Sequence, residues 1–175
     1  MVNSKLGRPT KERMAIIRNQ VSNLLWNEKL ETTFDRAKAT CSMAEKMLTL
    51  AIDSYEDTVK VMKKVKDEKG VETQKEFIND GPKKLKARKK LTSFLYDLQE
   101  QKAEKESKAS FRARTSEVKH PLIEKIFNVY APRYAERAKN LGQRGGYTRI
   151  IKLGTRRGDC AETELVLDYQ ARHGA

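Results

Sequence analysis

The sequence predicts an α+β fold: a small three-stranded sheet with helices packed on one side, plus charged insertions that are helical or flexible. The first observation is a set of three short strand-like segments, at residues 29–33, 147–153 and 162–168. The second is their order, because one helical pattern precedes the first strand, another follows it, and a third precedes the last two strands. This order favours α+β over a doubly wound sheet, in which helices and strands alternate throughout.

The basic charge is distributed over the whole chain. The 175 residues have the size of one domain and a formal net charge of +13. The excess is +4 in residues 1–50, +4 in residues 51–118 and +5 in residues 119–175. Such a distribution favours nucleic acid as the partner over an anionic membrane surface. No apolar run approaches the length of a membrane span and no signal peptide opens the chain, so we expect no membrane partner.

The first helices and the first strand have recognisable boundaries. Residues 1–10 have little apolar content and indicate an irregular basic arm. Thr10 is the expected N-cap of the first helix, which ends near Asn27. Thr33 closes the first strand and is the expected N-cap of the second helix. That second helix has a clear apolar stripe: Phe34, Ala37, Cys41, Ala44, Leu48 and Ala51.

The middle of the chain differs in character. Residues 55–80 are charged and weakly patterned, with a turn expected at Gly70. A basic helix is expected over about residues 82–98, where a proline stands at the first position. Residues 99–115 are polar again and predict an exposed helix or a flexible segment. We therefore interpret residues 54–118 as charged insertions around the basic helix.

The predicted core, residues 11–53 and 119–169, closes with a helix and two strands. Pro132 disfavours helical geometry at Ala131, so we expect a break or kink at that point of the closing helix. The last strand alternates cleanly between two faces. Residues 170–175 form a tail without a pattern.

Two acid-free basic runs are the candidate functional feature. Residues 137–158 hold seven basic and no acidic residues, and five glycines interrupt them. A second such run covers residues 81–96. Backbone that can approach closely and cations without local counter-charges suit a polyanion, although surface cations are often only solvated. The candidates in these runs are Lys86, Arg88, Arg144, Arg149, Lys152, Arg156 and Arg157.

Three further candidate RNA-binding residues also have an explanation that does not involve RNA. Arg36 and Lys38 stand early in the second helix, where the helix dipole disfavours cations by up to about 1 kcal/mol, so a bound anion or simple solvation would explain them. Tyr147 could stack on a base, but a tyrosine that opens a strand more often belongs to the core. Low aromatic content favours phosphate and shape recognition of a folded RNA over base-specific reading of single strands.

No catalytic or metal site is visible, so we expect neither an enzyme nor a cofactor nor a small-molecule substrate. His120 and His173 are the only histidines, and no phosphate-loop, dinucleotide or metal motif accompanies them. Cys41 and Cys160 lack metal-ligand spacing, and the sequence leaves a disulfide open. Because Cys41 falls on the apolar face of the second helix, we interpret it as a buried thiol in a reducing cytoplasmic setting.

Several stretches, in the right order, resemble the bacterial large-subunit ribosomal protein L17 family. They are KLGR (5–8), RNQVSNLL (18–25), LETTFDRAKA (30–39), TSFLYD (92–97), LIEKIFNVYAPRYAER (122–137) and GGYTRIIKLGTRRGD (145–159). The last is the longest and most specific. The resemblance covers roughly residues 5–53 and 119–169, with a weaker match near residues 82–97.

The resemblance implies an α+β structural protein that contacts large-subunit ribosomal RNA near the polypeptide exit tunnel, beside neighbouring large-subunit ribosomal proteins. It implies a role in subunit assembly and translation and no catalysis. The family's basic positions carry over to Lys5, Arg8, Arg13, Arg18, Lys38, Arg133, Arg149, Lys152, Arg156 and Arg157.

The chain departs from the family pattern in its arm, near residues 39–43, and in two long connections at residues 54–81 and 99–119. Our hypothesis is that these insertions reach additional RNA helices or neighbouring proteins. The alternative to the ribosomal interpretation is a free-standing basic regulator that binds nucleic acid or an acidic partner.

Overall fold

A three-stranded antiparallel sheet forms one layer of the core, as predicted. The computed structural model describes residues 5–66, 72–116 and 118–168. The strand order is β1-β5-β4: β1 (Lys29–Thr33) and β4 (Thr148–Thr155) each pair with the central β5 (Glu162–Asp168). The expected tail at residues 170–175 lies outside the described residues.

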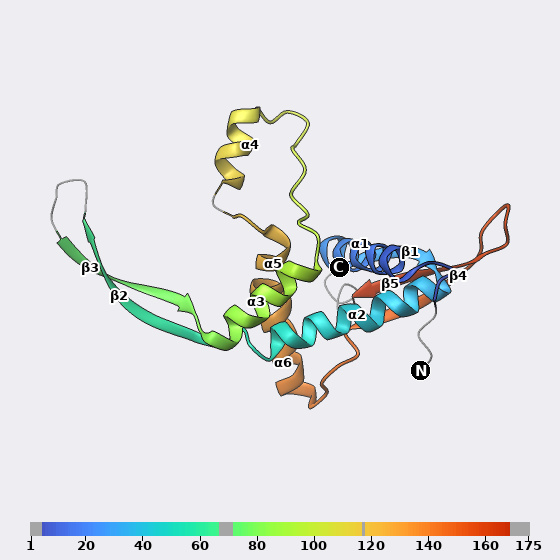
Figure 1. The fold of residues 1–175 in the computed structure, drawn as a ribbon, viewed down its shortest axis with the longest axis horizontal. Coiled ribbons are helices and arrows are strands. Elements are labelled where there is room, and N and C mark those ends of the chain that lie inside the picture. Colours follow the sequence, from blue (N-terminus) through green and yellow to red (C-terminus); the bar gives the residue numbers. More distant parts are fainter. Residues whose placement is uncertain (1–4, 67–71, 117, 169–175) are drawn as a thin grey trace.

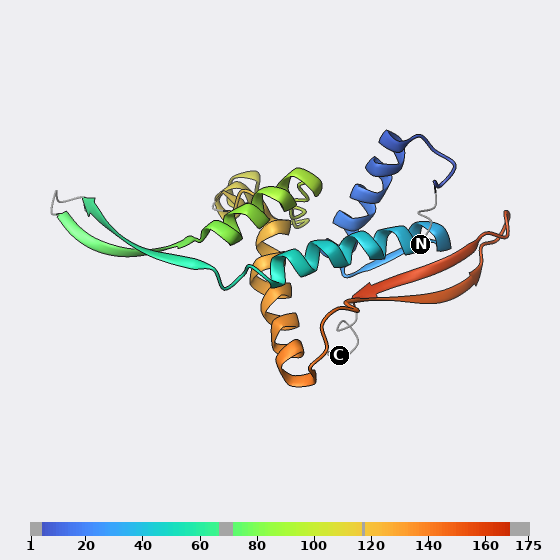
Figure 2. The same ribbon diagram turned by 60° about the horizontal axis from the view of Figure 1, so that its bottom comes forward.

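Two long helices cover this sheet (Figures 1 and 2). α2 (Phe34–Ile52) contacts all three strands, and α1 (Thr10–Asn27) packs against α2 and against β1 and β5. The predicted bounds of both helices are close to those observed. Neither expected side-chain cap forms, because Pro9 rather than Thr10 precedes α1, and Thr33 precedes α2 without a side-chain hydrogen bond.

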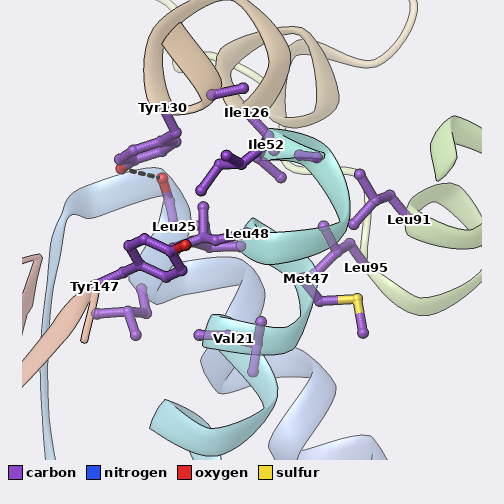
Figure 3. Close-up of a cluster of buried hydrophobic side chains, with 14 of the residues drawn as sticks. Val21, Leu25, Met47, Leu48, Ile52, Leu91, Leu95, Ile126, Tyr130 and Tyr147 are labelled. Carbon is purple, nitrogen blue, oxygen red and sulfur yellow. Dashed lines mark hydrogen bonds between the residues drawn. The ribbon is translucent and has the colours of Figure 1, made fainter. Parts of the chain in front are cut away.

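The apolar core lies between these helices and a further helical segment, residues 121–141. Figure 3 shows its centre, where Tyr130 donates a hydrogen bond of 2.8 Å to the carbonyl oxygen of Leu25. The central strand contributes Val166, which is fully buried, while Leu30 and Ile150 lie opposite it in the register of the neighbouring strands and pack on the core. Cys41 is a buried free thiol, as predicted, and burial raises its pKa.

The first insertion is a two-stranded antiparallel ribbon, not a helical or flexible segment. β2 (Thr58–Lys66) and β3 (Glu72–Asp80) pair in continuous register and extend away from the core (Figure 1). Val59, Val61 and Val65 share the period of two that is typical of a strand, but Lys63 interrupts this series and other lysines lie between the valines, so the run reads as weakly patterned. Gly70, the expected turn, lies outside the described residues.

The base of the ribbon is fixed to α3 (Pro82–Phe94). The Asp57 carboxylate accepts hydrogen bonds from the backbone N–H groups of Lys83 (2.7 Å) and Lys84 (3.3 Å), so it caps the helix from outside. The N–H of Gly81 donates to the carbonyl of Asp57 at 2.8 Å. A Cβ at position 81 would lie 2.4 Å from this carboxylate, so the close approach requires glycine.

The basic helix ends earlier than predicted, at Phe94 rather than near residue 98. Leu95 turns into extended geometry and is buried, and the N–H of Tyr96 donates to the hydroxyl of Ser22 at 2.9 Å. The second insertion contains one short helix, α4 (Lys108–Thr115), while residues 97–103 have no regular structure. The sequence alone leaves a helix and a flexible segment as alternatives for this insertion.

The closing helix does not break at Ala131. α5 (Pro121–Lys125) continues through a π-helical turn, η1 (Ile126–Tyr130), into α6 (Ala131–Leu141). Pro132 has no N–H to donate to the carbonyl four residues earlier, and the N–H of Ala131 instead bonds the carbonyl of Ile126. A wider turn therefore accommodates the proline within one helical segment.

The cap of α3 is testable. We expect Asp57→Ala to lower the free energy of unfolding by about 1 kcal/mol, because two backbone N–H groups lose their acceptor. Asp57→Asn keeps an acceptor oxygen and is expected to cost less. Urea unfolding of both variants measures the difference, and equal stabilities of Asp57→Ala and the unchanged protein would contradict the capping role.

Candidate nucleic-acid interface

The predicted basic strand, β4, is joined to β5 by the loop of residues 156–161, and we call β4, this loop and β5 the hairpin. Its loop end projects from the sheet. Arg149, Lys152 and Arg157 are exposed, and no ion pair joins them to another residue of the described chain. Lys152 stands opposite Glu164 in the register, yet Glu164 is buried and neither of its carboxylate oxygens has a hydrogen-bond partner among the described residues. These cations are therefore available to an external anion.

The tip of the hairpin is held by its own hydrogen bonds. Arg156 and Asp159 form an ion pair through two bonds, one of them 3.1 Å from Nε to Oδ1. The N–H of Arg156 donates to the carbonyl of Ala161 at 2.8 Å, and the N–H of Ala161 donates to Asp159 at 3.3 Å. The hydrogen bond from Arg156 lowers the pKa of Asp159 to about 2. The tip thus presents Arg157 on an ordered loop, while Arg156 is already paired with Asp159.

Arg36 and Arg156 line one pocket although 120 positions separate them in sequence. They line a polar pocket of about 360 Å³ between α1, β1 and the hairpin, together with Gln20, Glu31, Thr32, Thr33 and Thr163. Arg36 is half-buried there, and Lys38 is exposed with its Nζ 5.7 Å from the ring centroid of Phe34. Two guanidinium groups with hydroxyl and amide neighbours outnumber the one carboxylate, Glu31, and so suit a phosphate.

The arm and α1 present their cations differently. Lys5 is exposed, and Arg8 pairs with Glu12 at 3.2 Å. Arg13 is half-buried on α1. Arg18 is also half-buried, and its guanidinium lies 5.3 Å from the ring centroid of Phe94, toward α3. Arg18 therefore contributes to helix packing as well as to charge.

The cations of α3 divide into two sets according to helix phase. Arg88 bonds Asp80 (2.7 Å) and Glu124 and lies over the ring of Phe127. Burial works against its charged form, but Glu124 and Asp80 outweigh that effect and the pKa of Arg88 is raised. The opposite side of the helix carries four exposed lysines without ion pairs in the described chain: Lys83, Lys86, Lys89 and Lys90.

Sequence reasoning selects Lys86 and Arg88 from this helix and misses the other three lysines. The structure finds them by their exposure, whereas Ala87 and Leu91 of the same helix are buried. Arg88 is fixed by acids from β3 and α5, and these partners are not visible from the local sequence.

The remaining candidates lie around α6. Tyr147 is 5 % exposed, and its ring packs 4.6 Å from that of Tyr134, so the structure favours its core interpretation over base stacking. Arg133 is half-buried over the ring of Tyr130. Arg144 is exposed and lies 3.5 Å from Asp53. Arg137 donates to the carbonyls of Gly145 (3.3 Å) and Gly146 (3.4 Å), which fixes the glycine-rich loop before β4.

The described part of the chain contains neither a cluster of metal-ligating side chains nor a helix suited to cross a membrane. Within residues 5–66, 72–116 and 118–168, no three His, Cys, Asp or Glu side chains are grouped to hold a metal ion. None of the helices in these ranges combines the length and the apolar character needed to cross a membrane.

Comparison with known proteins decides the family. A sequence model of the family described as Ribosomal protein L17 matches residues 16–167. The chain belongs to the Ribosomal protein L17 family. The predicted resemblance is thereby confirmed, and so is the prediction of a structural protein rather than an enzyme.

Curated relatives in the L17 family align along nearly the whole chain. A "Large ribosomal subunit protein bL17" of Lachnospira eligens is 40% identical over 182 residues, which cover 93% of this chain and 96% of that protein. Proteins of the same name from Clostridium tetani and Clostridium acetobutylicum are 37% and 35% identical over 93% of this chain, and the alignments cover 93% and 92% of those proteins.

The ion pair at the hairpin tip makes a pH prediction. The pKa of Asp159 is about 2 in the folded protein against an ordinary 3.8, so the pair contributes stability above about pH 3.8 that is lost as the pH falls through about 2. We expect a carboxyl NMR titration of Asp159 to show a midpoint near 2. Arg156→Gln should move it up toward 3.8, while Arg157→Gln should not. An unmoved midpoint in Arg156→Gln would refute the assignment.

Proposed function

We propose that the protein is a structural component of the large ribosomal subunit in the cytoplasm, where it binds folded ribosomal RNA and supports subunit assembly and translation. Membership of the L17 family carries this proposal, because the curated relatives are named as large-subunit proteins. The resemblance in the sequence extends it to a position near the polypeptide exit tunnel, beside neighbouring large-subunit proteins.

The exposed cations support phosphate recognition as the mode of binding. Arg149, Lys152 and Arg157 on the hairpin form no ion pair within the described residues, and the four lysines on the solvent side of α3 form a second such surface. The described core offers few exposed aromatic rings to stack on bases, since Tyr130, Tyr134 and Tyr147 are buried. Contacts to the RNA backbone fit this distribution, and they position a protein on a folded RNA without reading its sequence.

The pocket between Arg36 and Arg156 is proposed as a phosphate site on that RNA. Arg36 occupies the first turns of α2, where the positive end of the helix dipole disfavours a cation unless an anion is close. A phosphate between the two guanidinium groups would offset the unfavourable position of the Arg36 charge. It would also join the start of α2 to the hairpin loop that carries Arg156. The remaining predicted contacts, Lys5, Arg8, Arg13, Lys38, Arg133 and Arg144, lie on other parts of the surface and are proposed as backbone contacts.

The ribosomal assignment is tested by sedimentation of a cell lysate through a sucrose gradient in moderate salt. We expect about one copy of the protein per large subunit, because a structural component is stoichiometric with its RNA, and we expect release after ribonuclease treatment. Protein that remains at the top of the gradient, or that sediments with the small subunit, would instead favour the free-standing regulator.

The hairpin surface is tested through the salt dependence of binding to large-subunit RNA. Removal of one cation that binds a phosphate lowers the slope of log affinity against log salt by about 1. We therefore expect the triple variant Arg149→Gln, Lys152→Gln, Arg157→Gln to reduce the slope by about 3. The matched control is Arg114→Gln, because Arg114 is exposed but already paired with Glu100 and Glu106. Equal slopes for the triple variant and the control would exclude the hairpin as a phosphate surface.

A further inference from the structure

The ribbon of β2 and β3 makes few contacts with the rest of the protein. It extends away from the core, and its two strands contact mainly each other (Figures 1 and 2). Apolar side chains are nevertheless exposed along it: Val59, Met62, Phe77 and Ile78. An isolated two-stranded ribbon is marginally stable in water, and exposed apolar patches mark surfaces of interaction. The ribbon therefore has the character of a docking element.

The direction of the ribbon is fixed at its base, so it presents its faces in a defined orientation. Asp57 and Gly81 join the two ends of the ribbon through a backbone hydrogen bond of 2.8 Å. Asp80, at the end of β3, bonds Lys84 (3.1 Å) and Arg88 (2.7 Å) on α3. Arg88 continues this chain of contacts to Glu124 on α5.

The two faces of the ribbon differ in charge. One face carries Lys60, which pairs with Glu76 at 3.0 Å, and Asp80, which pairs with Lys84 and Arg88 of α3, so it holds charges of both signs. We name the other the Phe77 face. It consists of positions 59, 61, 63 and 65 of β2 and 73, 75, 77 and 79 of β3, and no acidic residue occupies any of them.

Two rows of the Phe77 face are suited to different parts of one nucleotide. Lys63 is exposed on this face and offers one row a cation. In the next row Phe77 stands opposite Val61, about 7 Å along the strands. The Phe77 side chain is 39% exposed, and the Nζ of Lys63 lies 5.6 Å from its ring centroid. An aromatic surface thus adjoins an exposed cation.

We propose that the Phe77 face binds an unstacked nucleotide of ribosomal RNA, with the base on the ring of Phe77 and the phosphate at Lys63. This inference rests on the proposed function. Unstacked bases of folded RNA are recognised by stacking on aromatic side chains, and lysines satisfy the adjacent phosphates.

Charge favours RNA over a neighbouring protein as the occupant of this face. β2 carries four lysines and no acid, and the ribbon continues directly into α3, whose solvent side carries four more lysines without ion pairs in the described chain. A protein partner would need both an apolar centre and an acidic rim. A nucleotide supplies an apolar base and a negative phosphate in one unit.

The test compares large subunits that carry Phe77→Leu or Lys63→Gln with subunits that carry the unchanged protein. The controls are Phe77→Tyr, which keeps an aromatic ring, and Lys60→Gln on the opposite face. Base reactivity and backbone cleavage of the RNA are probed chemically. We expect Phe77→Leu to raise the reactivity of one base, or a few adjacent bases, about fivefold or more, the factor implied by removing one base–aromatic stack. Lys63→Gln should expose the adjoining backbone, and both controls should retain the protection.

The outcomes separate this inference from the proposed function. Variants present at one copy per subunit with unchanged RNA reactivity would overturn the inference and leave the function intact, as would a photocross-link from position 77 to a protein. Absence of the unchanged protein from large subunits would overturn the proposed function itself. Lys63 is exposed, so Lys63→Gln reports on binding even where Phe77→Leu disturbs the ribbon.

Discussion

The close approach of α2 to the rest of the core is the constraint on which the fold depends. Ala37, Ala44 and Ala51 recur every seventh residue along this helix and have no exposed surface. Their small side chains let the sheet, α1 and the helical segment of residues 121–141 pack against one central element, which contacts each of them. A larger side chain at any of these positions would separate layers that also carry the functional residues, since β4 and the start of α2 take their places from this packing.

The same packing decides which basic residues are bonded within the protein and which remain exposed to a polyanion. A net charge of +13 suggests a surface covered with free cations, yet several of the basic residues hold the protein together. Arg88 links β3 to α5, and Arg137 fixes the loop before β4 through two carbonyl groups. The cations that remain open to a polyanion are concentrated on the hairpin and on the outer side of α3. Charge counts therefore overestimate the surface available for RNA.

The sequence predicts those parts of the structure whose causes are local. α2 and β5 follow from apolar periodicity within one segment, and the three-stranded sheet follows from their order. The ribbon is missed because charged residues on both faces conceal a period of two, and the unbroken closing helix is missed because a π-turn accommodates Pro132. The partners of Arg88, and the pocket that Arg36 and Arg156 both line, come from distant segments, so no local pattern could show them.

The hydrogen bond between Asp57 and Gly81 has an evolutionary consequence. Because the chain leaves the core and returns to it at the same point, the residues between form a side branch, and their number can change without displacing α2 or α3. Lengthening, shortening or replacing such a branch alters what the protein can reach while the scaffold stays the same. A gene for this fold could thus acquire a new contact by a single in-frame insertion, with no compensating change elsewhere in the core.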